Sequence, residues 1–148
     1  MSTTAVASGR SVRLVGLVAI IAGIVLIVAG AATWAVVRTQ LVAENITVAE
    51  DAAMFAGKTV DGPLDAYYQA DIINTHSLEI GGGKTYAELD REDPARASVM
   101  NGSFLRASLF TSVIAFGVAA FAAGMGFLFI LVGWALRKLV PAGAAITA

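Results

Sequence analysis

The sequence predicts an all-α membrane protein in which two transmembrane helices are joined by a small, mostly helical extracytoplasmic domain. No charged residue lies within 14–37 or within 107–136, and each run exceeds the roughly 20 apolar residues that span a bilayer as a helix. Hydrophobic residues make up 57% of the chain and charged residues 14%, whereas about 25% is typical of soluble domains. A soluble chain of 148 residues has too small an interior to bury two helices that are apolar on all sides.

The charges divide the chain into five segments. Segments 1–13 and 137–148 carry no acid, and their only charged residues are Arg10, Arg13, Arg137 and Lys138. All eleven acids lie from Glu44 to Asp93, so segment 38–106, with six bases, has a net charge of −5. Because basic flanks of spans prefer the cytoplasm, we predict a multi-pass plasma-membrane protein with cytoplasmic tails 1–13 and 137–148, spans 14–37 and 107–136, and an acidic extracytoplasmic domain 38–106.

The start of the chain admits two interpretations. Residues 1–9 are rich in Ser, Thr and Ala and predict a disordered tail. Residues 29–31 (Ala-Gly-Ala) fit the small-residue pattern of a signal-peptide cleavage site. The apolar run before them is longer than the roughly 7–15 residues of a signal sequence, so an uncleaved anchor is favoured. The chain has no cysteine, which excludes disulfides, thiolate metal sites and cysteine nucleophiles.

Small residues on both spans predict helix packing. Gly16, Gly23 and Gly30 recur every seven residues and form a narrow groove on the first span, where close backbone approach favours helix association in lipid. The groove serves either homo-oligomerisation or packing against the second span of the same chain. The second span has two small-residue faces, which suggests two helix contacts: one face carries Gly117, Ala120 and Gly124, and the other carries Ala119, Ala122, Gly126 and Gly133. Neither span contains an ionisable residue, which argues against a proton relay, an ion pump or a carrier of charged substrates.

Between the spans, we expect the first helix to continue to about Glu44 and residues 46–48 to be extended. A further helix is predicted from Pro63 to about residues 78–80, with Asp61 as its cap and Gly81-Gly82-Gly83 as its end. Asp93-Pro94 predicts the N-cap and first position of a last helix that runs through residues 101–102 into the second span.

The loop holds a few candidate sites. Residues 81–85 (Gly-Gly-Gly-Lys-Thr) end like a phosphate-binding loop, but Leu78 stands where that motif needs its first glycine, which favours a helix stop. Asp71, His76 and Glu79 are candidates for a sensor of divalent ions, although a single imidazole among exposed carboxylates is more often a surface residue. The acidic run Glu88, Asp90, Glu92 and Asp93 lacks the spacing of an EF-hand. No metal, cofactor or catalytic residue is predicted.

The phrases MFAGKTVDGP and GGGKTYAELDREDPARASVMNGSFLRASLFTSVIAFG, together with the paired spans, resemble a family of small two-span actinobacterial membrane proteins often labelled aromatic ring-opening dioxygenase. The resemblance covers residues 13–138 and implies no functional residue. The label conflicts with the residues present, because extradiol cleavage by non-haem iron needs two histidines and a carboxylate, and this chain has one histidine.

The sequence therefore predicts a non-catalytic membrane protein. Its expected partners are the lipid bilayer and either other membrane subunits or further copies of itself, with no nucleic acid and no small-molecule substrate. The leading hypothesis is a structural or accessory subunit of a cell-envelope or membrane complex, or a self-associating protein. The alternative is an ion- or ligand-sensing module that uses the acidic loop.

Overall fold

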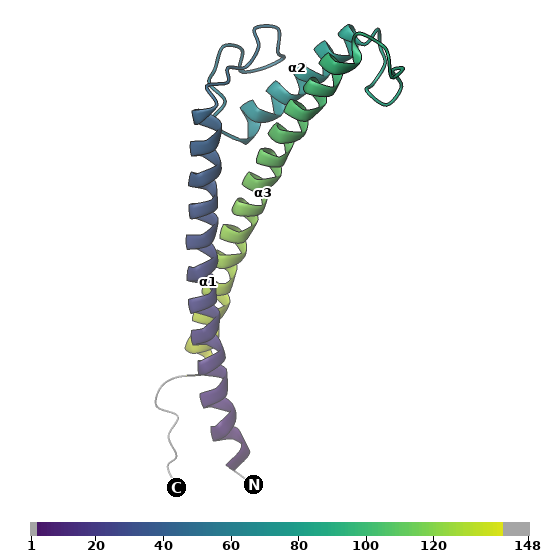
Figure 1. Ribbon diagram of the computed structural model, residues 1–148. Coiled ribbons are helices and arrows are strands. Elements are labelled where there is room, and N and C mark those ends of the chain that lie inside the picture. Colours follow the sequence, from purple (N-terminus) through teal and green to yellow (C-terminus); the bar gives the residue numbers. More distant parts are fainter. Residues whose placement is uncertain (1–2, 141–148) are drawn as a thin grey trace. The chain divides into compact units, whose positions relative to one another are not determined.

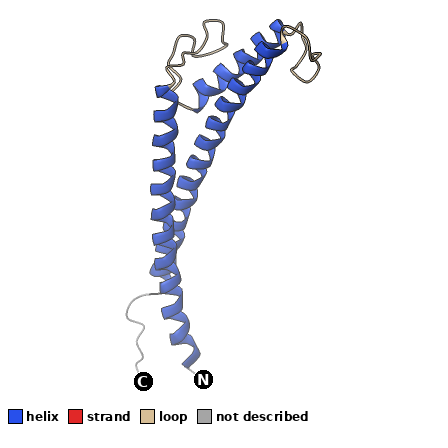
Figure 2. Ribbon diagram, viewed as in Figure 1, coloured by secondary structure: helices blue, strands red, loops and turns tan. Residues whose placement is uncertain are grey.

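The computed structural model describes residues 3–140, with side chains from Gly9 onward. It contains three helices, α1 (Thr3–Ala43), α2 (Pro63–Ile80) and α3 (Arg96–Leu139) (Figure 1). The described residues contain no strand (Figure 2), so the predicted all-α class is confirmed. The chain forms two compact units. We call the first, up to Ala32 and from Val118, the paired-helix unit, and the second, Thr33–Gly117, the loop unit.

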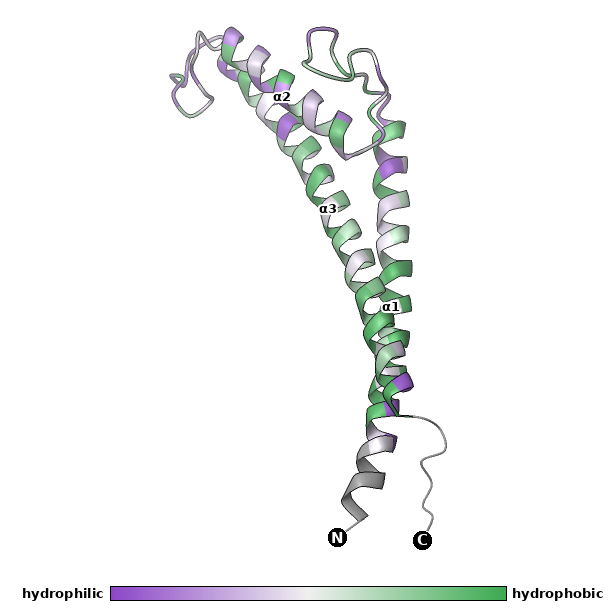
Figure 3. Cartoon of the chain, turned by 180° about the vertical axis from the view of Figure 1, so that it is seen from behind, coloured by the Kyte–Doolittle hydropathy of each residue, from purple (hydrophilic) through white to green (hydrophobic). Residues whose placement is uncertain are grey.

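Two helices are long and apolar enough to span a membrane, over Gly9–Ala43 and Arg96–Leu139. Only 17% of the most apolar stretch of each is buried, whereas the core helix of a soluble protein is mostly buried. Figure 3 shows hydrophobic residues over most of both helices in the paired-helix unit. α1 begins at Thr3, so residues 3–9, expected as a disordered tail, are helical instead.

The start of α2 differs from the prediction in its cap. The N-cap is Gly62, not Asp61, and Pro63 follows at the first helical position as expected. Asp65 Oδ1 accepts a hydrogen bond from the Gly62 N–H at 2.8 Å, which is the return half of a capping box. Asp61 does not cap the helix, and its carboxylate binds the side chains of Arg38 and Lys58 instead.

The end of α2 explains the three glycines. The Gly83 N–H donates to the Leu78 carbonyl at 2.7 Å and the Gly82 N–H to the Glu79 carbonyl at 3.1 Å, the two bonds of a Schellman motif. Gly82 has a φ of 62°, the left-handed conformation that this motif requires and that glycine adopts without strain. The Gly-Gly-Gly-Lys-Thr sequence is therefore accounted for as a helix stop.

α3 begins at Arg96, two residues beyond the predicted start at Pro94. The Asp93 carboxylate accepts the N–H of Ala95 at 2.8 Å, and the Asp93 carbonyl accepts the N–H of Arg96 at 3.0 Å, so Asp93 closes a turn just before the helix. From Arg96 the helix runs without interruption through residues 101–102 to Leu139, as predicted.

The loop unit has its own small core. Val48 and Val60 are buried together with Ala66 and Ala70 of α2 and Phe116 of α3. Residues 46–60 fold back on themselves, because the Val48 N–H donates to the Lys58 carbonyl and the Val60 N–H to the Ile46 carbonyl, each at 2.9 Å. The segment expected to be extended, residues 46–48, lies in this pairing, which includes one antiparallel bridge between Thr47 and Thr59.

Candidate functional site

The glycine groove of α1 faces α3 within the paired-helix unit. A Cβ atom added to Gly16 would lie 2.8 Å from the Gly133 carbonyl oxygen, and one added to Gly30 would lie 2.6 Å from that of Ala119. At the middle position, a Cβ on Gly23 would overlap the Gly126 carbonyl oxygen. The residue numbers rise along α1 as they fall along α3, so the two helices pack antiparallel.

The contacts are reciprocal at two of the three levels. A Cβ on Gly126 would meet the Gly23 carbonyl oxygen, and a Cβ on Gly133 would meet that of Gly16. Each backbone thus occupies the space that a side chain on the other would need. A repeat of seven residues keeps one face of a helix on its partner as in a left-handed coiled coil. We call this set of contacts the glycine ladder: Gly16, Gly23, Gly30, Ala119, Gly126 and Gly133.

The other small-residue face of α3 has a different environment. Nothing lies within 4 Å of a Cβ added to Gly117 or Gly124, and Ala120 is exposed. The structure therefore brings the first-span glycines together with one of the two α3 faces and leaves the other without a protein neighbour in the described part of the chain.

A charged cluster lies between the end of α1 and the start of α2, in the loop unit. Asp61 binds Arg38 Nη2 at 2.8 Å and Lys58 Nζ at 3.2 Å. Lys58 also donates to Asp65 Oδ2 at 2.7 Å. Asp65 is 2% exposed, and its other oxygen accepts the N–H groups of Gly62 and Ala66 at 2.8 Å each. Two bases and two acids thus neutralise one another and fix the first turn of α2 to the preceding loop.

The Arg38 guanidinium, with Lys58 second, lowers the pKa of Asp61 from 3.8 to about 2. The Asp65 carboxylate, with Asp61 second, raises the pKa of Lys58. When folding lowers the pKa of an acid, that acid stabilises the folded state at pH values above its ordinary pKa. This contribution is lost as the pH falls through the pKa of the acid in the folded state. The Asp61 contribution is therefore fully present above about pH 4 and disappears as the pH approaches 2.

We expect Arg38→Gln to move the pKa of Asp61 back towards 3.8, because the variant removes the strongest hydrogen bond that favours the carboxylate form. Carboxyl 13C chemical shifts of the protein in micelles, followed from pH 6 to pH 2, measure this pKa. Lys84→Gln is the matched control, since it removes a charge from the same loop unit without touching Asp61. Identical Asp61 titrations in Arg38→Gln and the unsubstituted protein would contradict the assignment.

The three sensor candidates do not form one group. His76 Nε2 lies 2.6 Å from Asp51 Oδ2, a residue 25 positions away, and this contact lowers the pKa of Asp51. Asp71 and Glu79 are exposed. Among the described residues, no group of three or more His, Asp or Glu side chains is arranged to hold a metal ion. The His76–Asp51 pair instead attaches the 46–60 loop to α2.

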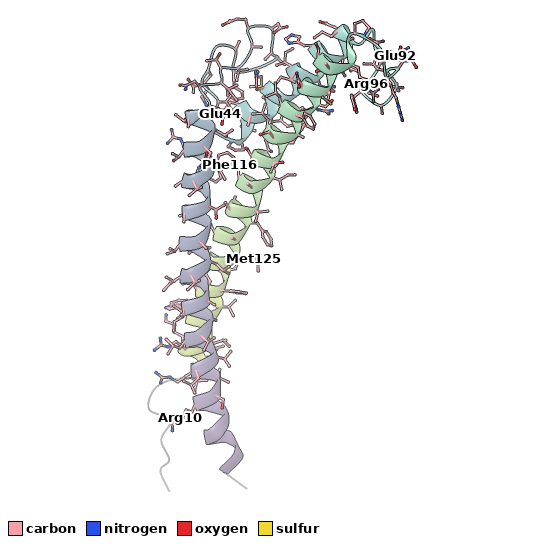
Figure 4. All side chains as sticks on the ribbon, in the orientation of Figure 1. Arg10, Glu44, Glu92, Arg96, Phe116 and Met125 are labelled. Atoms are coloured by element: carbon pink, nitrogen blue, oxygen red, sulfur yellow. The ribbon has the colours of Figure 1, made fainter. Side chains whose placement is uncertain are left out.

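Arg96 holds the segment between α2 and α3. Its Nη1 donates to the Tyr86 carbonyl at 3.1 Å and to the Leu89 carbonyl, and its guanidinium lies 4.1 Å from the centre of the Tyr86 ring. Figure 4 shows Arg96 on the first turn of α3, beside the loop that carries Glu92. The acidic run contributes a local contact of its own, because Glu88 accepts the N–H and the hydroxyl of Thr85 at 2.8 and 2.7 Å.

Sequence reasoning missed the roles of Asp65 and Arg96. An acid three residues after the N-cap is one half of the capping-box pattern, so the first role had a partial signal. The second had none, because arginine bound to backbone carbonyls ten and seven residues away leaves no fixed spacing. Comparison with protein-family models, curated proteins and solved structures gave no match.

Proposed function

We propose that this protein is a non-catalytic integral membrane protein that spans the bilayer twice and serves as a structural or accessory subunit of a membrane assembly, or associates with itself. The observation that carries the proposal is the glycine ladder between two long apolar helices whose remaining surfaces are exposed. Close packing through glycines suits helices that associate in lipid, where burial of large apolar side chains supplies no driving force.

The placement of charge supports an orientation with both termini in the cytoplasm. α1 and α3 are antiparallel in the paired-helix unit, so Arg10, Arg13, Arg137 and Lys138 lie at one end of the pair. Every acidic residue falls in the loop unit. Basic residues in the two segments outside the spans, with all the acids in the segment between them, match the positive-inside rule.

The absence of cysteine makes this orientation directly testable. Lys84→Cys places a single thiol on an exposed loop position, and Arg10→Cys places one at the basic end of α1. In intact cells, a membrane-impermeant maleimide should label Lys84→Cys alone, whereas after permeabilisation it should label both variants. Labelling of Arg10→Cys in intact cells would reverse the orientation, and recovery of the protein in the soluble fraction would reject the membrane assignment.

An accessory subunit and a self-associating protein differ in which proteins the purified assembly contains. Purification in a mild detergent through a tag after Ala148, followed by native electrophoresis and mass spectrometry, distinguishes the two. Stoichiometric recovery of other membrane proteins would identify an accessory subunit, and recovery at a multiple of 15.2 kDa would identify self-association. A single copy without partners would contradict both.

A further inference from the structure

The glycine ladder brings all the basic residues of the paired-helix unit to the same level. Gly16 faces Gly133, and a Cβ on Gly9 would lie 3.1 Å from Val140 Cγ1. The segment of α1 between residues 9 and 16 therefore lies alongside residues 133–140 of α3. Arg10 and Arg13 belong to the first segment, and Arg137 and Lys138 belong to the second. Figure 4 marks this end by the label on Arg10.

The segments that carry these four bases contain no acidic side chain. The sequence contains no Asp or Glu in residues 1–43 or 94–148, so no carboxylate side chain of the paired-helix unit can neutralise them. Arg10, Arg137 and Lys138 are exposed, and Arg13 is half-buried. In the charged cluster of the loop unit, by contrast, each base binds a carboxylate.

Exposed apolar side chains lie next to these four bases. Trp134 is 55% exposed, and the Lys138 ammonium lies 4.3 Å from the centre of its ring. The aliphatic stem of Arg137 lies against α1, since its Cγ would be 2.9 Å from a Cβ on Gly16. Leu14 and Val15, which follow Arg13 directly along α1, are also exposed. A complementary ligand must therefore present an anion and a long apolar body together.

We propose that this surface, formed by Arg10, Arg13, Trp134, Arg137 and Lys138 and here called the basic end, binds the headgroups of anionic phospholipids in the cytoplasmic leaflet. The inference rests on the proposed two-span membrane function. Guanidinium groups bind phosphate oxygens in a bidentate manner, and an indole ring suits the boundary between headgroups and acyl chains. The phospholipid is preferred over free phosphate because only the lipid covers the exposed apolar side chains next to the charges.

The two tryptophans provide a local reporter. Trp34→Phe leaves Trp134, at the basic end, as the only tryptophan of the chain. Full-length Trp34→Phe protein is reconstituted in phosphatidylcholine bilayers that contain either brominated phosphatidylglycerol or brominated phosphatidylcholine, and quenching of Trp134 gives the relative association of the two lipids. Because each base near an anionic surface contributes roughly a fivefold preference, we expect brominated phosphatidylglycerol to be favoured at least fivefold, with a preference that decreases as salt is raised.

Three controls isolate the headgroup effect. Trp134→Phe leaves Trp34, four residues after Gly30 in the sequence, as the reporter, and we expect it to show no preference between the lipids. Arg10→Gln/Arg13→Gln/Arg137→Gln in the Trp34→Phe background retains Lys138 and its contact with Trp134, and it should lower the preference at least fivefold relative to the Trp34→Phe protein. Excess inorganic phosphate should leave the preference unchanged beyond the effect of an equal ionic strength of chloride.

Equal quenching of Trp134 by both brominated lipids would overturn the proposal while leaving the membrane-spanning function intact. If inorganic phosphate lowered the preference more than chloride at equal ionic strength, the ligand of the basic end would be a soluble anion rather than a lipid. That result would also overturn the proposal. An absence of quenching by either lipid at both tryptophans would mean that the helices do not lie in the bilayer, and would reject the proposed function and this inference together.

Discussion

Gly23→Leu is expected to separate α1 from α3 and to destabilise the paired-helix unit by about 3 kcal/mol, at the upper end of the usual cost of overpacking. The new Cβ would overlap the Gly126 carbonyl oxygen and would lie 3.1 Å from the Ile130 backbone nitrogen. Both are backbone atoms, so no side chain can turn aside to relieve the overlap. The helices must move apart, which also opens the contacts at Gly16 and Gly30.

The matched control is Val25→Leu, two residues along the same helix, where the side chain is 60% exposed and has room for one more methylene. Unfolding of the purified protein in mixed micelles, followed by circular dichroism as the denaturing detergent is increased, measures both variants. A lowered midpoint for Gly23→Leu with an unchanged midpoint for Val25→Leu is the expected result. Equal midpoints for the two variants would show that the glycine ladder does not stabilise the protein.

Asp65→Ala is expected to unravel the start of α2 and to cost about 3 kcal/mol. The substitution removes a capping interaction, typically about 1 kcal/mol, and a charge-assisted hydrogen bond at a buried position, typically about 1.5–3 kcal/mol. The N–H groups of Gly62 and Ala66 lose their shared acceptor, and Lys58 loses its closest partner. Because Ala66 belongs to the core of the loop unit, the effect should spread to the packing of the 46–60 loop.

Asp71→Ala is the control for this variant, since it removes the same functional group from the same helix at an exposed position. Hydrogen exchange of the peptide that covers α2, measured by mass spectrometry on the micellar protein, reports the local stability. Exchange should accelerate by roughly two orders of magnitude in Asp65→Ala, as about 3 kcal/mol implies, and should change little in Asp71→Ala. Unchanged exchange in Asp65→Ala would show that Lys58 and Arg38 suffice to hold the turn through Asp61.

The helices were predictable because their signals are local in the chain. Runs without charge at 14–37 and 107–136 locate the apolar parts of α1 and α3, and Pro63 and the glycines after Ile80 delimit α2. The start of α3 was misplaced by two residues because the hydrogen bonds that Asp93 accepts close a turn at 93–96 before the regular helix begins at Arg96. The cap of α2 was assigned to Asp61 because an Asp shortly before a Pro that begins a helix is a common N-cap signal, and nothing local reveals that Arg38 binds its carboxylate.

The side-chain pairs were harder to predict because they join distant parts of the chain. His76 was compared with acids on its own helix, yet its partner Asp51 is on the folded-back loop. Heptad spacing identified the α1 glycines, but spacing alone did not decide which face of α3 they meet. That choice depends on helix rotation, which is set by every contact along the interface rather than by the small residues of one face.

The glycine ladder also bears on how the two helices keep their alignment. Glycines that recur every seven residues form a pattern that nearly repeats on itself, so a slide of one helix by about 10 Å would place Gly23 opposite Gly133 and Gly30 opposite Gly126. After such a slide Gly16 would face Val140, as Gly9 does now, and Gly30 would face Gly126 and Ile130, as Gly23 does now. Two of the three levels of the ladder would remain, but Ala119 would lose its contact with Gly30. The seven-residue repeat therefore sets the distance between the helices, and the number of close levels favours the observed longitudinal position.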